Sequence, residues 1–298
     1  MNCERFEFRE GLLKRYLNKR KEKLFKSVTA LSLPVFMRNV DVISYAPSTS
    51  GYYEARIVKI IQFFAQDNQL NDFFIDIGAN IGLISCQVVS CFKECHCFEP
   101  NPDCFKILSV NLNITSNHSS EIQLYNFGLG EREFGTELVV PKSNWGGGSI
   151  VDGNGYTDAL LTQNSHHDFL YYQIKIQKTS KVLGNLFLSL KKKGLKRGVI
   201  KIDVEGYELP ILKEIQTILP EDFELVIIFE NHEKNLLNEF NELFHGKSKL
   251  YQLTRYPKKE TPSLKKLFAL IKHFGYKHKL TDINSQGSMD YVLTVNLR

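Results

Sequence analysis

The clearest chemical signal in this chain is a carboxylate followed by a glycine-rich turn. Apolar residues 73–75 lead to Asp76, and Gly78, Asn80 and Gly82 mark a turn that opens a second apolar run. A strand, a glycine turn and a helix start together form a geometry that holds nucleotide-like ligands at a helix N-terminus. The spacing D-x-G-x-x-x-G lacks the third glycine of the dinucleotide fingerprint. An Asp at this turn would repel a phosphate, so the turn favours a ligand that carries positive charge.

A second acid supports a nucleoside ligand. Glu99 follows Asp76 by 23 residues, at the end of another strand-like segment. An αβ unit delivers an acid at about this distance to a bound ribose, where one carboxylate accepts hydrogen bonds from both hydroxyls. Asn126 ends a third strand-like segment and is a candidate for the adenine edge, although Asn-x-Gly is also ordinary turn chemistry. The pattern favours S-adenosylmethionine (SAM), with these cofactor-binding residues: Asp76, Gly78, Asn80, Gly82, Glu99 and Asn126.

Four short motifs stand out together: D-I-G-A-N-I-G at 76–82, F-E-P-N-P at 98–102, N-x-G-L-G at 126–130 and I-K-I-D-V-E-G-Y-E at 200–208. They resemble the FkbM-type methyltransferases, which are class I, SAM-dependent O-methyltransferases. The last motif is the specific one, because few other folds carry two acids and a glycine in that register. The resemblance implies a Rossmann-like sheet of seven strands. It also implies methyl transfer to a hydroxyl, often on a sugar of a glycan or of a glycosylated natural product.

The wider pattern predicts an α/β fold with a doubly wound, mostly parallel, seven-stranded sheet. Strand-like and helix-like segments alternate in the order 73–77, 81–91, 95–98, 102–114 and 122–126. The alternation resumes with a strand at 199–203, a helix at 208–219 and a strand at 225–230. A final pair of strands at 249–254 and 291–296 would close the sheet, with the last strand antiparallel.

We expect the chain to have two parts. Residues 1–70 would form an N-terminal basic helical extension, and residues 71–298 a SAM-dependent methyltransferase domain with an insertion at about 131–198. In this insertion, 137–140 and 171–177 alternate like antiparallel strands.

The insertion carries the chain's only tryptophan, Trp145, directly before three glycines. An aromatic face beside a flexible glycine hinge suits a sugar ring. Long insertions at the cofactor side of a sheet are usually binding loops or lids. We therefore expect Trp145 to contact the substrate, with an unremarkable surface loop as the alternative.

Methyl transfer to a hydroxyl needs a general base or a metal, because the hydroxyl pKa lies far above neutral pH. Ligands bind at the carboxyl edge of an open α/β sheet, and two polar clusters follow neighbouring strands there. The first cluster comprises Lys201, Asp203 and Glu205, and the second comprises Glu230, Asn231 and His232. We expect Lys201 to contact the substrate, and the catalytic residues to be Asp203, His232 and Glu205.

A metal ion is one way to acidify the hydroxyl. Asp203, Glu230 and Asn231 resemble the Asp…Asp-Asn set by which catechol O-methyltransferase-type enzymes hold Mg²⁺, with Glu230 in place of an Asp. Three oxygen ligands plus waters would suit octahedral Mg²⁺ or Mn²⁺. Alternatively, Asp203 contacts SAM or caps the next helix, and a protein base acts. His232 is then the first choice, because imidazole titrates near neutral pH, and Asp203 is the second.

Basic residues gather in two places, although the net charge is only +5. One group lies in the first thirty residues and another spans 258–279, and apolar residues interleave with both at near-helical spacing. Both groups predict surface helices, either with solvated lysines or with attraction to an anionic membrane surface or an acidic glycan. Nucleic acid is disfavoured as a partner, because no aromatic-basic recognition module is apparent.

The chain has no apolar stretch long enough to span a bilayer, and residues 1–9 carry charges where a signal peptide needs an apolar core. We therefore expect a cytoplasmic protein, which becomes membrane-peripheral if its basic helices bind lipid. Two other functions stay open. One is an NAD(P)-dependent oxidoreductase, which the missing third glycine disfavours. The other is a catalytically silent SAM-fold module that binds a partner through its basic helices.

Overall fold

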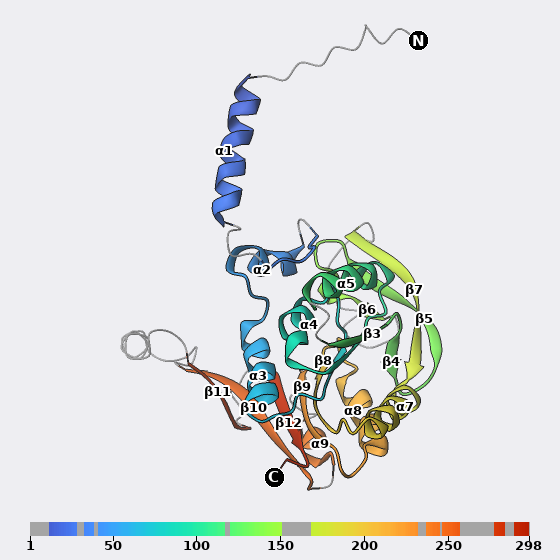
Figure 1. The fold of residues 1–298 in the computed structure, drawn as a ribbon. Helices are drawn as coiled ribbons and strands as arrows, with labels where there is room; N and C mark the ends of the chain where they lie inside the picture. Colours follow the sequence, from blue (N-terminus) through green and yellow to red (C-terminus); the bar gives the residue numbers. More distant parts are fainter. Residues whose placement is uncertain are drawn as a thin grey trace.

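The computed structural model describes residues 12–28, 33–38, 41–116, 120–150, 168–231, 237–244, 246–256, 277–283 and 289–297. The parallel strands of its central sheet are β1 (Phe73–Ile77), β2 (Glu94–Phe98), β3 (Glu121–Tyr125), β8 (Arg197–Ile202) and β9 (Glu224–Glu230). Three strands at one edge pair antiparallel: β10 (Ser248–Tyr256), β11 (Lys277–Asp282) and β12 (Asp290–Val295). The strand order is β11-β10-β12-β9-β8-β1-β2-β3, and Figure 1 shows the antiparallel strands β10, β11 and β12 together at one side of the molecule.

The central sheet is therefore mixed and has eight strands in the described residues, where the sequence predicts seven. The extra strand is β11, which overlaps the end of the second basic group at residues 277–279, where a surface helix was expected. It pairs antiparallel with β10 at the outer edge of the sheet. Lysine is common on exposed edge strands, where it discourages pairing with other chains. Because lysine is also common on surface helices, the basic composition of this segment could not predict which of the two it forms. Residues 258–276 of that group lie outside the described part of the chain.

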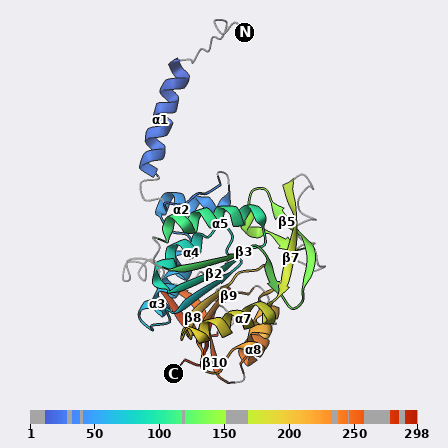
Figure 2. The same cartoon turned by 45° about the vertical axis from the view of Figure 1, so that its right-hand side comes forward.

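Helices cover both faces of the sheet, as the doubly wound prediction requires. One layer comprises α3 (Ala55–Gln66), α4 (Leu83–Val88) and α5 (Pro102–Thr115), with a short 3-10 turn η3 (Val89–Cys91). The other comprises α7 (Thr179–Lys192), α8 (Glu208–Ile218) and α9 (Leu237–Glu242). Figure 2 shows α4 and α5 on one side of the central strands and α7 and α8 on the other.

Strand β1 shows how the sequence serves both layers. Phe73, Ile75 and Ile77 pack in an apolar cluster with residues of α7 and α8. Phe74 packs in a second cluster with residues of α3 and α4. Successive side chains of a strand point to opposite faces, so an uninterrupted buried run is what a strand covered on both sides requires.

Helix α7 lies within the expected insertion but belongs to the core. Leu183, Phe187 and Leu190 are fully buried and pack in the same cluster as Phe73 and Ile75 of β1. Their spacing of i, i+4 and i+7 is the ordinary signal of an amphipathic helix. The part of 131–198 that leaves the doubly wound core is therefore the segment before α7.

That segment contributes to a second sheet of four strands. Its strands are β4 (Gly128–Gly130), β5 (Phe134–Pro141), β6 (Ser149–Ile150) and β7 (Phe169–Lys178), in the order β4-β7-β5-β6. β5 and β7 pair antiparallel along the length of β5, which confirms the pairing expected from their alternation. A 3-10 turn, η4 (Trp145–Gly147), joins β5 to β6. Residues 151–167 lie outside the described part.

The N-terminal helix α1 (Leu12–Val28) extends away from the rest of the protein (Figure 1). Its side chains Tyr16, Leu17, Leu24 and Phe25 are exposed. The chain then continues through residues 33–38, a 3-10 turn η2 (Val42–Ser44) and a short helix α2 (Tyr45–Ser50) before it reaches α3. No helix in the described residues is both long and apolar enough to cross a bilayer.

Candidate cofactor and acceptor site

A cavity of about 320 Å³ opens at the carboxyl ends of β1, β2, β8 and β9. This is the edge of an open α/β sheet at which ligands bind. We call it the central cavity. Eight of the residues expected to form a site line it: Gly78, Asn80, Glu99, Trp145, Lys201, Asp203, Glu205 and Glu230. It thus brings three of the expected cofactor residues together with four members of the two expected catalytic clusters.

Gly78 is required because two loops meet at its position. Its φ is +82°, and a Cβ there would lie 1.9 Å from the backbone oxygen of Asp203. The Asp203 amide in turn donates to the Ile77 oxygen at 2.9 Å. The turns after β1 and β8 are therefore held together backbone to backbone, and no larger residue fits.

Gly82 has a different role from the one expected. It caps the N-terminus of α4 with a φ of +83°, and a Cβ there would lie 2.7 Å from the Leu108 side chain. It is not among the residues that line the central cavity. Gly82 therefore permits close packing of α4 on α5, while Gly78 and Asn80 form the cavity wall.

Glu99 is held by backbone amides on both sides. The Asn80 amide donates to Glu99 Oε2 at 2.7 Å, and the Asn101 amide donates to Oε1 at 2.7 Å. Burial raises the pKa of Glu99 to about 7, although the two amides oppose the rise. A carboxylate offers about four acceptor positions. Two positions therefore stay available to ribose hydroxyls, in an orientation that the backbone has already set.

Asn101 is a cavity residue that the sequence reasoning missed. Its Oδ1 accepts from the Asp103 amide at 3.0 Å and caps α5, which begins with a proline at its first position. Its Nδ2 is buried and, within the described residues, has no hydrogen-bond partner. A buried donor without a partner is costly, so Asn101 can supply a hydrogen bond to a ligand acceptor. An Asn before Pro is a common helix-cap signal, and it was present in F-E-P-N-P.

Asp76 lies beneath the central cavity rather than on its wall. It is fully buried, and Ser85 Oγ of α4 donates to its Oδ2 at 2.5 Å. Its Oδ1 lies 3.5 Å from Lys201 Nζ. Strand alternation explains this placement, because Asp76 shares a face of β1 with Phe74, toward α4. Asp76 therefore positions other residues, whereas the sequence reasoning expected it to touch the cofactor.

Asn126 also supports the cavity from outside its wall. Its Nδ2 donates to the backbone oxygen of Glu99 at 2.9 Å and to the backbone oxygen of Pro100 at 3.2 Å. These bonds fix the turn after β2, which carries Glu99 and Asn101. Asn126 is not among the residues that line the central cavity.

At the other end of the cavity the buried Lys201 forms an ion pair with Asp203, whose side chain is 46% exposed. Lys201 Nζ lies 2.9 Å from Asp203 Oδ2, and the Lys201 side chain is only 6% exposed. Burial works against a charged lysine, but Asp203, Asp76 and Glu54 outweigh it and hold the pKa of Lys201 above its ordinary value. A charged ammonium therefore occupies the space between Asp76 and Asp203.

The expected metal ligands do not fit a divalent ion. Asp203 and Glu230 line the cavity, but the Lys201 ammonium already neutralises Asp203. Asn231 is buried and is not among the residues that line the cavity. Its backbone amide donates to the backbone oxygen of Met289 at 2.9 Å. Among the described residues, no group of three or more His, Cys, Asp or Glu side chains is placed to hold a metal. His232 lies outside the described part of the chain.

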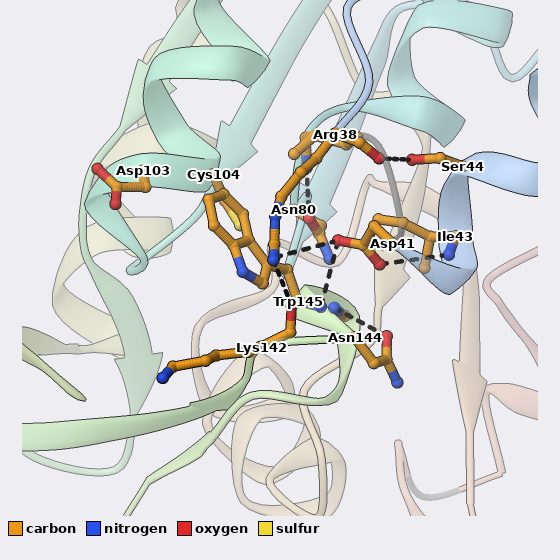
Figure 3. Close-up of polar contacts among 12 residues, drawn as sticks. Arg38, Asp41, Ile43, Ser44, Asn80, Asp103, Cys104, Lys142, Asn144 and Trp145 are labelled. Carbon is orange, nitrogen blue, oxygen red and sulfur yellow. Dashed lines mark hydrogen bonds and ion pairs between the residues drawn. The ribbon is translucent and has the colours of Figure 1, made fainter. Parts of the chain in front are cut away.

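Trp145 is held by a segment from the N-terminal part of the chain (Figure 3). The Arg38 guanidinium lies 4.3 Å from the centre of the Trp145 ring, and Arg38 Nη2 donates to the Lys142 oxygen. The Trp145 amide donates to Asp41 Oδ2 at 3.4 Å. The Asn144 side chain accepts from the Gly146 amide and caps η4. These contacts fix the ring on the cavity wall, in a cluster with apolar residues that follow β1 and β2.

Tyr53 and Glu54 also line the cavity, although the sequence reasoning assigned residues 1–70 to an extension. Gln87 of α4 holds this segment, because its Nε2 donates to the Tyr53 oxygen at 3.0 Å and its Oε1 accepts from the Tyr53 amide at 3.4 Å. Glu54 has a positive φ of 43°. No local pattern predicts that a residue just before an amphipathic helix will reach a site formed by later strands.

Comparison with known proteins places the chain in a family. The methyltransferase FkbM domain matches residues 76–277. Methyltransferase sdnD of Sordaria araneosa is 28% identical over 169 residues, which are 52% of this chain and 64% of that protein. The chain thus matches less than two thirds of the length of this relative.

Two solved structures are remotely similar. The FkbM methyltransferase of Methylobacillus flagellatus KT has 12% identity and a TM-score of 0.38, over 92% of this chain and 59% of that one. A SAM-dependent methyltransferase of Agrobacterium tumefaciens has 8% identity and a TM-score of 0.40, over 82% and 62%. Neither similarity bears on substrate or mechanism. The domain match covers more than half of the chain, and the protein therefore belongs to the FkbM-domain methyltransferase family.

Proposed function

We propose that this protein is a SAM-dependent O-methyltransferase that methylates a sugar hydroxyl of a glycan or of a glycosylated metabolite. The observation that carries the cofactor is Glu99, whose two oxygens are aligned by the Asn80 and Asn101 amides on the cavity wall. The unpartnered Nδ2 of Asn101 offers a further hydrogen-bond donor to a nucleoside beside it. The cavity volume lies in the range of about 300–1,000 Å³ that is common for small-ligand sites.

The charge of the cavity supports both the cofactor and a neutral acceptor. Among the described lining residues, Lys201 is the only basic one, whereas the acids are Glu54, Glu99, Asp203, Glu205 and Glu230. SAM carries a sulfonium and an ammonium, which such a lining attracts. An acceptor with a phosphate or carboxylate near its hydroxyl would be repelled. We therefore propose a neutral or amine-bearing sugar as the acceptor.

The residues divide the work of the reaction. SAM, when bound, supplies an activated methyl group. Glu99 and Asn101 orient its nucleoside, and the Lys201–Asp203 pair fixes the turn that faces the acceptor. Trp145 offers an aromatic surface to the sugar ring. Alignment of the hydroxyl with the methyl carbon is the main catalytic requirement of such an in-line transfer.

We test this function with methyl-deuterated SAM and a panel of neutral, amine-bearing and acidic glycans. The expected result is that the labelled methyl group appears on a hydroxyl of a neutral or amine-bearing sugar while S-adenosylhomocysteine forms in equal amount, as mass spectrometry would show. Binding of SAM without transfer to any acceptor would instead favour the catalytically silent module. Binding of NAD without SAM would favour an oxidoreductase.

We further propose that α1 brings the protein to an anionic membrane surface. Its exposed apolar residues Tyr16, Leu17, Leu24 and Phe25 lie on a helix whose exposed basic residues include Arg20, Lys21, Lys23 and Lys26. Apolar contact and lysine charge together bind amphipathic helices to anionic lipid. Each lysine near such a surface adds about 1 kcal/mol. A cytoplasmic location with peripheral membrane contact would place the site beside lipid-linked sugars.

Vesicle flotation tests the membrane proposal. The wild-type protein should float with vesicles that contain phosphatidylserine, and not with phosphatidylcholine alone. A variant with Lys21→Glu, Lys23→Glu and Lys26→Glu should stay in solution. The charge-matched control reverses three exposed lysines on other helices, Lys59, Lys106 and Lys213, and should still float. Equal flotation of both variants, or binding of RNA but not of vesicles, would contradict the proposal.

A further inference from the structure

Glu54 places a carboxylate at the end of the central cavity lined by Lys201, Asp203 and Glu230, which we call the acceptor end because we propose that the acceptor enters there. It lines this cavity together with Asp203 and Glu230. It also lines a smaller adjoining pocket with Lys201, Glu230 and Asp290. Glu54 therefore stands at the carboxyl ends of β8 and β9, although it comes from the segment before α3.

The Glu54 carboxylate differs from its acidic neighbours in its partners. Glu99 accepts from two backbone amides, and Asp203 is paired with Lys201 at 2.9 Å. Within the described residues, the Glu54 carboxylate makes no hydrogen bond or ion pair, and the residue is accessible. An acceptor hydroxyl that reaches the Glu54 carboxylate in the cavity therefore displaces no hydrogen-bond or ion-pair partner among the described residues.

The backbone of Glu54 is strained. Its φ and ψ are 43° and 52°, in the left-handed region that residues other than glycine and asparagine rarely adopt. Such strain costs of the order of 1 kcal/mol or more, and it tends to be retained at functional sites. The Gln87 contacts to Tyr53 hold the segment in this conformation. A glycine or an asparagine would fit this backbone conformation with less strain. The backbone therefore does not explain a glutamate at this position, and we look to its carboxylate for the reason.

The surroundings of Glu54 suit proton transfer near neutral pH. The residue as a whole is exposed, but the groups packed around its carboxyl remove part of the water there, and this raises the pKa of Glu54 to about 7. Lys201 opposes this rise, whereas Asp203, Asp290 and Glu230 add to it. A general base works best when its pKa lies near the working pH.

We propose that Glu54 is the general base that takes the proton from the acceptor hydroxyl; this inference rests on the proposed methyl transfer. In the step, the hydroxyl oxygen forms a bond to the methyl carbon, and the bond between that carbon and sulfur breaks. The electron pair of the broken bond goes to sulfur, and the hydroxyl proton goes to the Glu54 carboxylate. The products are a methyl ether, S-adenosylhomocysteine and a protonated Glu54, which then releases its proton to water.

The test uses the full-length protein with methyl-deuterated SAM and the acceptor found for the wild type. Glu54→Gln keeps the size of the side chain but removes its basicity, and Glu54→Asn also suits the left-handed backbone. Both variants should lose about 10²–10⁴ in kcat, the usual scale for a general base. Their dissociation constants for SAM, from calorimetry, should stay within about twofold of wild type, because a base for the acceptor contributes little to cofactor binding.

Two further readouts separate a base from a structural residue. Glu54→Asn should melt at or above the wild-type temperature, because asparagine relieves the strain. Gln69→Asn is the matched control: Gln69 has a φ of 57° and is exposed away from the cavity, so this variant should keep the wild-type kcat. The acidic limb of the wild-type kcat–pH profile, near pH 7, should be absent from the residual activity of Glu54→Gln.

The inference is overturned if Glu54→Gln keeps kcat within about threefold of wild type, a loss too small for a general base. It is also overturned if Glu54→Gln and Glu54→Asn lose SAM affinity by the same factor as kcat. A melting temperature of both variants so far below that of the wild type that the protein is unfolded in the assay would overturn it as well. A wild-type protein that binds SAM but methylates no acceptor would overturn the proposed function itself. The wild-type assay therefore judges the function, and the Glu54 variants judge the base.

Discussion

The two ends of the central cavity are built in different ways. The end that we propose for the cofactor, here called the cofactor end, uses Gly78, Asn80, Glu99 and Asn101, which follow two neighbouring strands, and its one carboxylate is aligned by backbone amides. The acceptor end combines Glu54 with residues after β8 and β9, and it depends on a buried ammonium between two carboxylates. The first end is assembled from one short stretch of chain, and the second from three distant ones.

This difference has consequences for how each end responds to substitution. Backbone amides cannot be removed by changing a side chain. A single substitution at the cofactor end should therefore lower the affinity for SAM and leave the protein folded. Buried charges depend on one another, because removing one leaves its partner uncompensated in a medium that solvates it poorly. Substitutions of the charged residues at the acceptor end should therefore also lower the free energy of unfolding. Glu54 is the exception, because its carboxylate has no charge partner at bonding distance in the described residues.

The largest effect should come from Lys201→Met. It leaves Asp76 and Asp203 without the ammonium that lies 3.5 Å and 2.9 Å from them. Breaking a buried pair in this way costs about 3–5 kcal/mol of unfolding free energy, measurable by urea denaturation. Lys213→Met is the matched control, since it removes a 2.7 Å pair with Glu239 whose lysine is 52% exposed. The control should cost at most about 1 kcal/mol. Equal losses in the two variants would contradict the dependence on buried charge.

The next effect should be on the cofactor end. Glu99→Ala should weaken SAM binding by about 1.5–3 kcal/mol, because charge-assisted hydrogen bonds to the ribose are lost. Calorimetry measures the affinity, and circular dichroism checks that the variant is folded. Glu94→Ala is the control, because Glu94 is a buried acid at the opposite end of the same strand. The ribose assignment fails if a folded Glu99→Ala binds SAM as tightly as the wild type.

A smaller effect should follow at Trp145. Trp145→Ala should lower kcat/KM for the acceptor about tenfold, or about 1.4 kcal/mol, while the dissociation constant of SAM changes by less than about twofold. Steady-state kinetics with varied acceptor and varied SAM distinguish the two. The ring packs near residues after β1 and β2, so this test decides which end of the cavity it serves. Loss of SAM affinity with unchanged acceptor kinetics would assign Trp145 to the cofactor end.

The smallest effect concerns pH. Burial raises the pKa of Glu208 to about 8, with Asp203 adding to the rise. A carboxyl whose folded pKa is raised stabilises the fold fully below its unfolded pKa and loses that stabilisation as pH rises through the folded value. Between pH 7 and 8.5 the ligand-free wild type should therefore lose about 2–5 °C in melting temperature.

Glu208→Gln should show a flatter dependence on pH over this range. Glu242→Gln, which changes an exposed glutamate, should follow the wild type. If Glu208→Gln lost melting temperature with pH as the wild type does, burial would not be keeping the Glu208 carboxyl protonated near neutral pH.

Part of the wall at the proposed cofactor end can be predicted from the sequence, because its signals are local. Gly78 and Glu99 come from motifs whose geometry requires those residue types, and both line the cavity. Asp76 illustrates a limit: its motif marks the site, but strand alternation turns its side chain toward Ser85. That alternation could have been read from the apolar residues on either side of it.

The acceptor end is harder to predict because it depends on packing between distant segments. Nothing near Glu54 indicates that α4 will hold it over β8, and a positive φ cannot be read from a Tyr-Glu-Ala sequence. The ion pair of Lys201 needs the register between β1 and β8, which sets Asp76 opposite Lys201. β11 was missed for a related reason, since its partner strand lies on the far side of residues 257–276. Side-chain patterns alone do not contain such pairings.

The most direct test of the account is a calorimetric titration of the wild-type protein with SAM, S-adenosylhomocysteine and NAD. We predict that SAM and S-adenosylhomocysteine bind one site per chain with micromolar or tighter affinity, and that NAD does not bind, because Glu99 and the acidic lining select a cationic nucleoside. Binding of NAD in place of SAM, or the absence of SAM binding by the folded protein, would contradict the account.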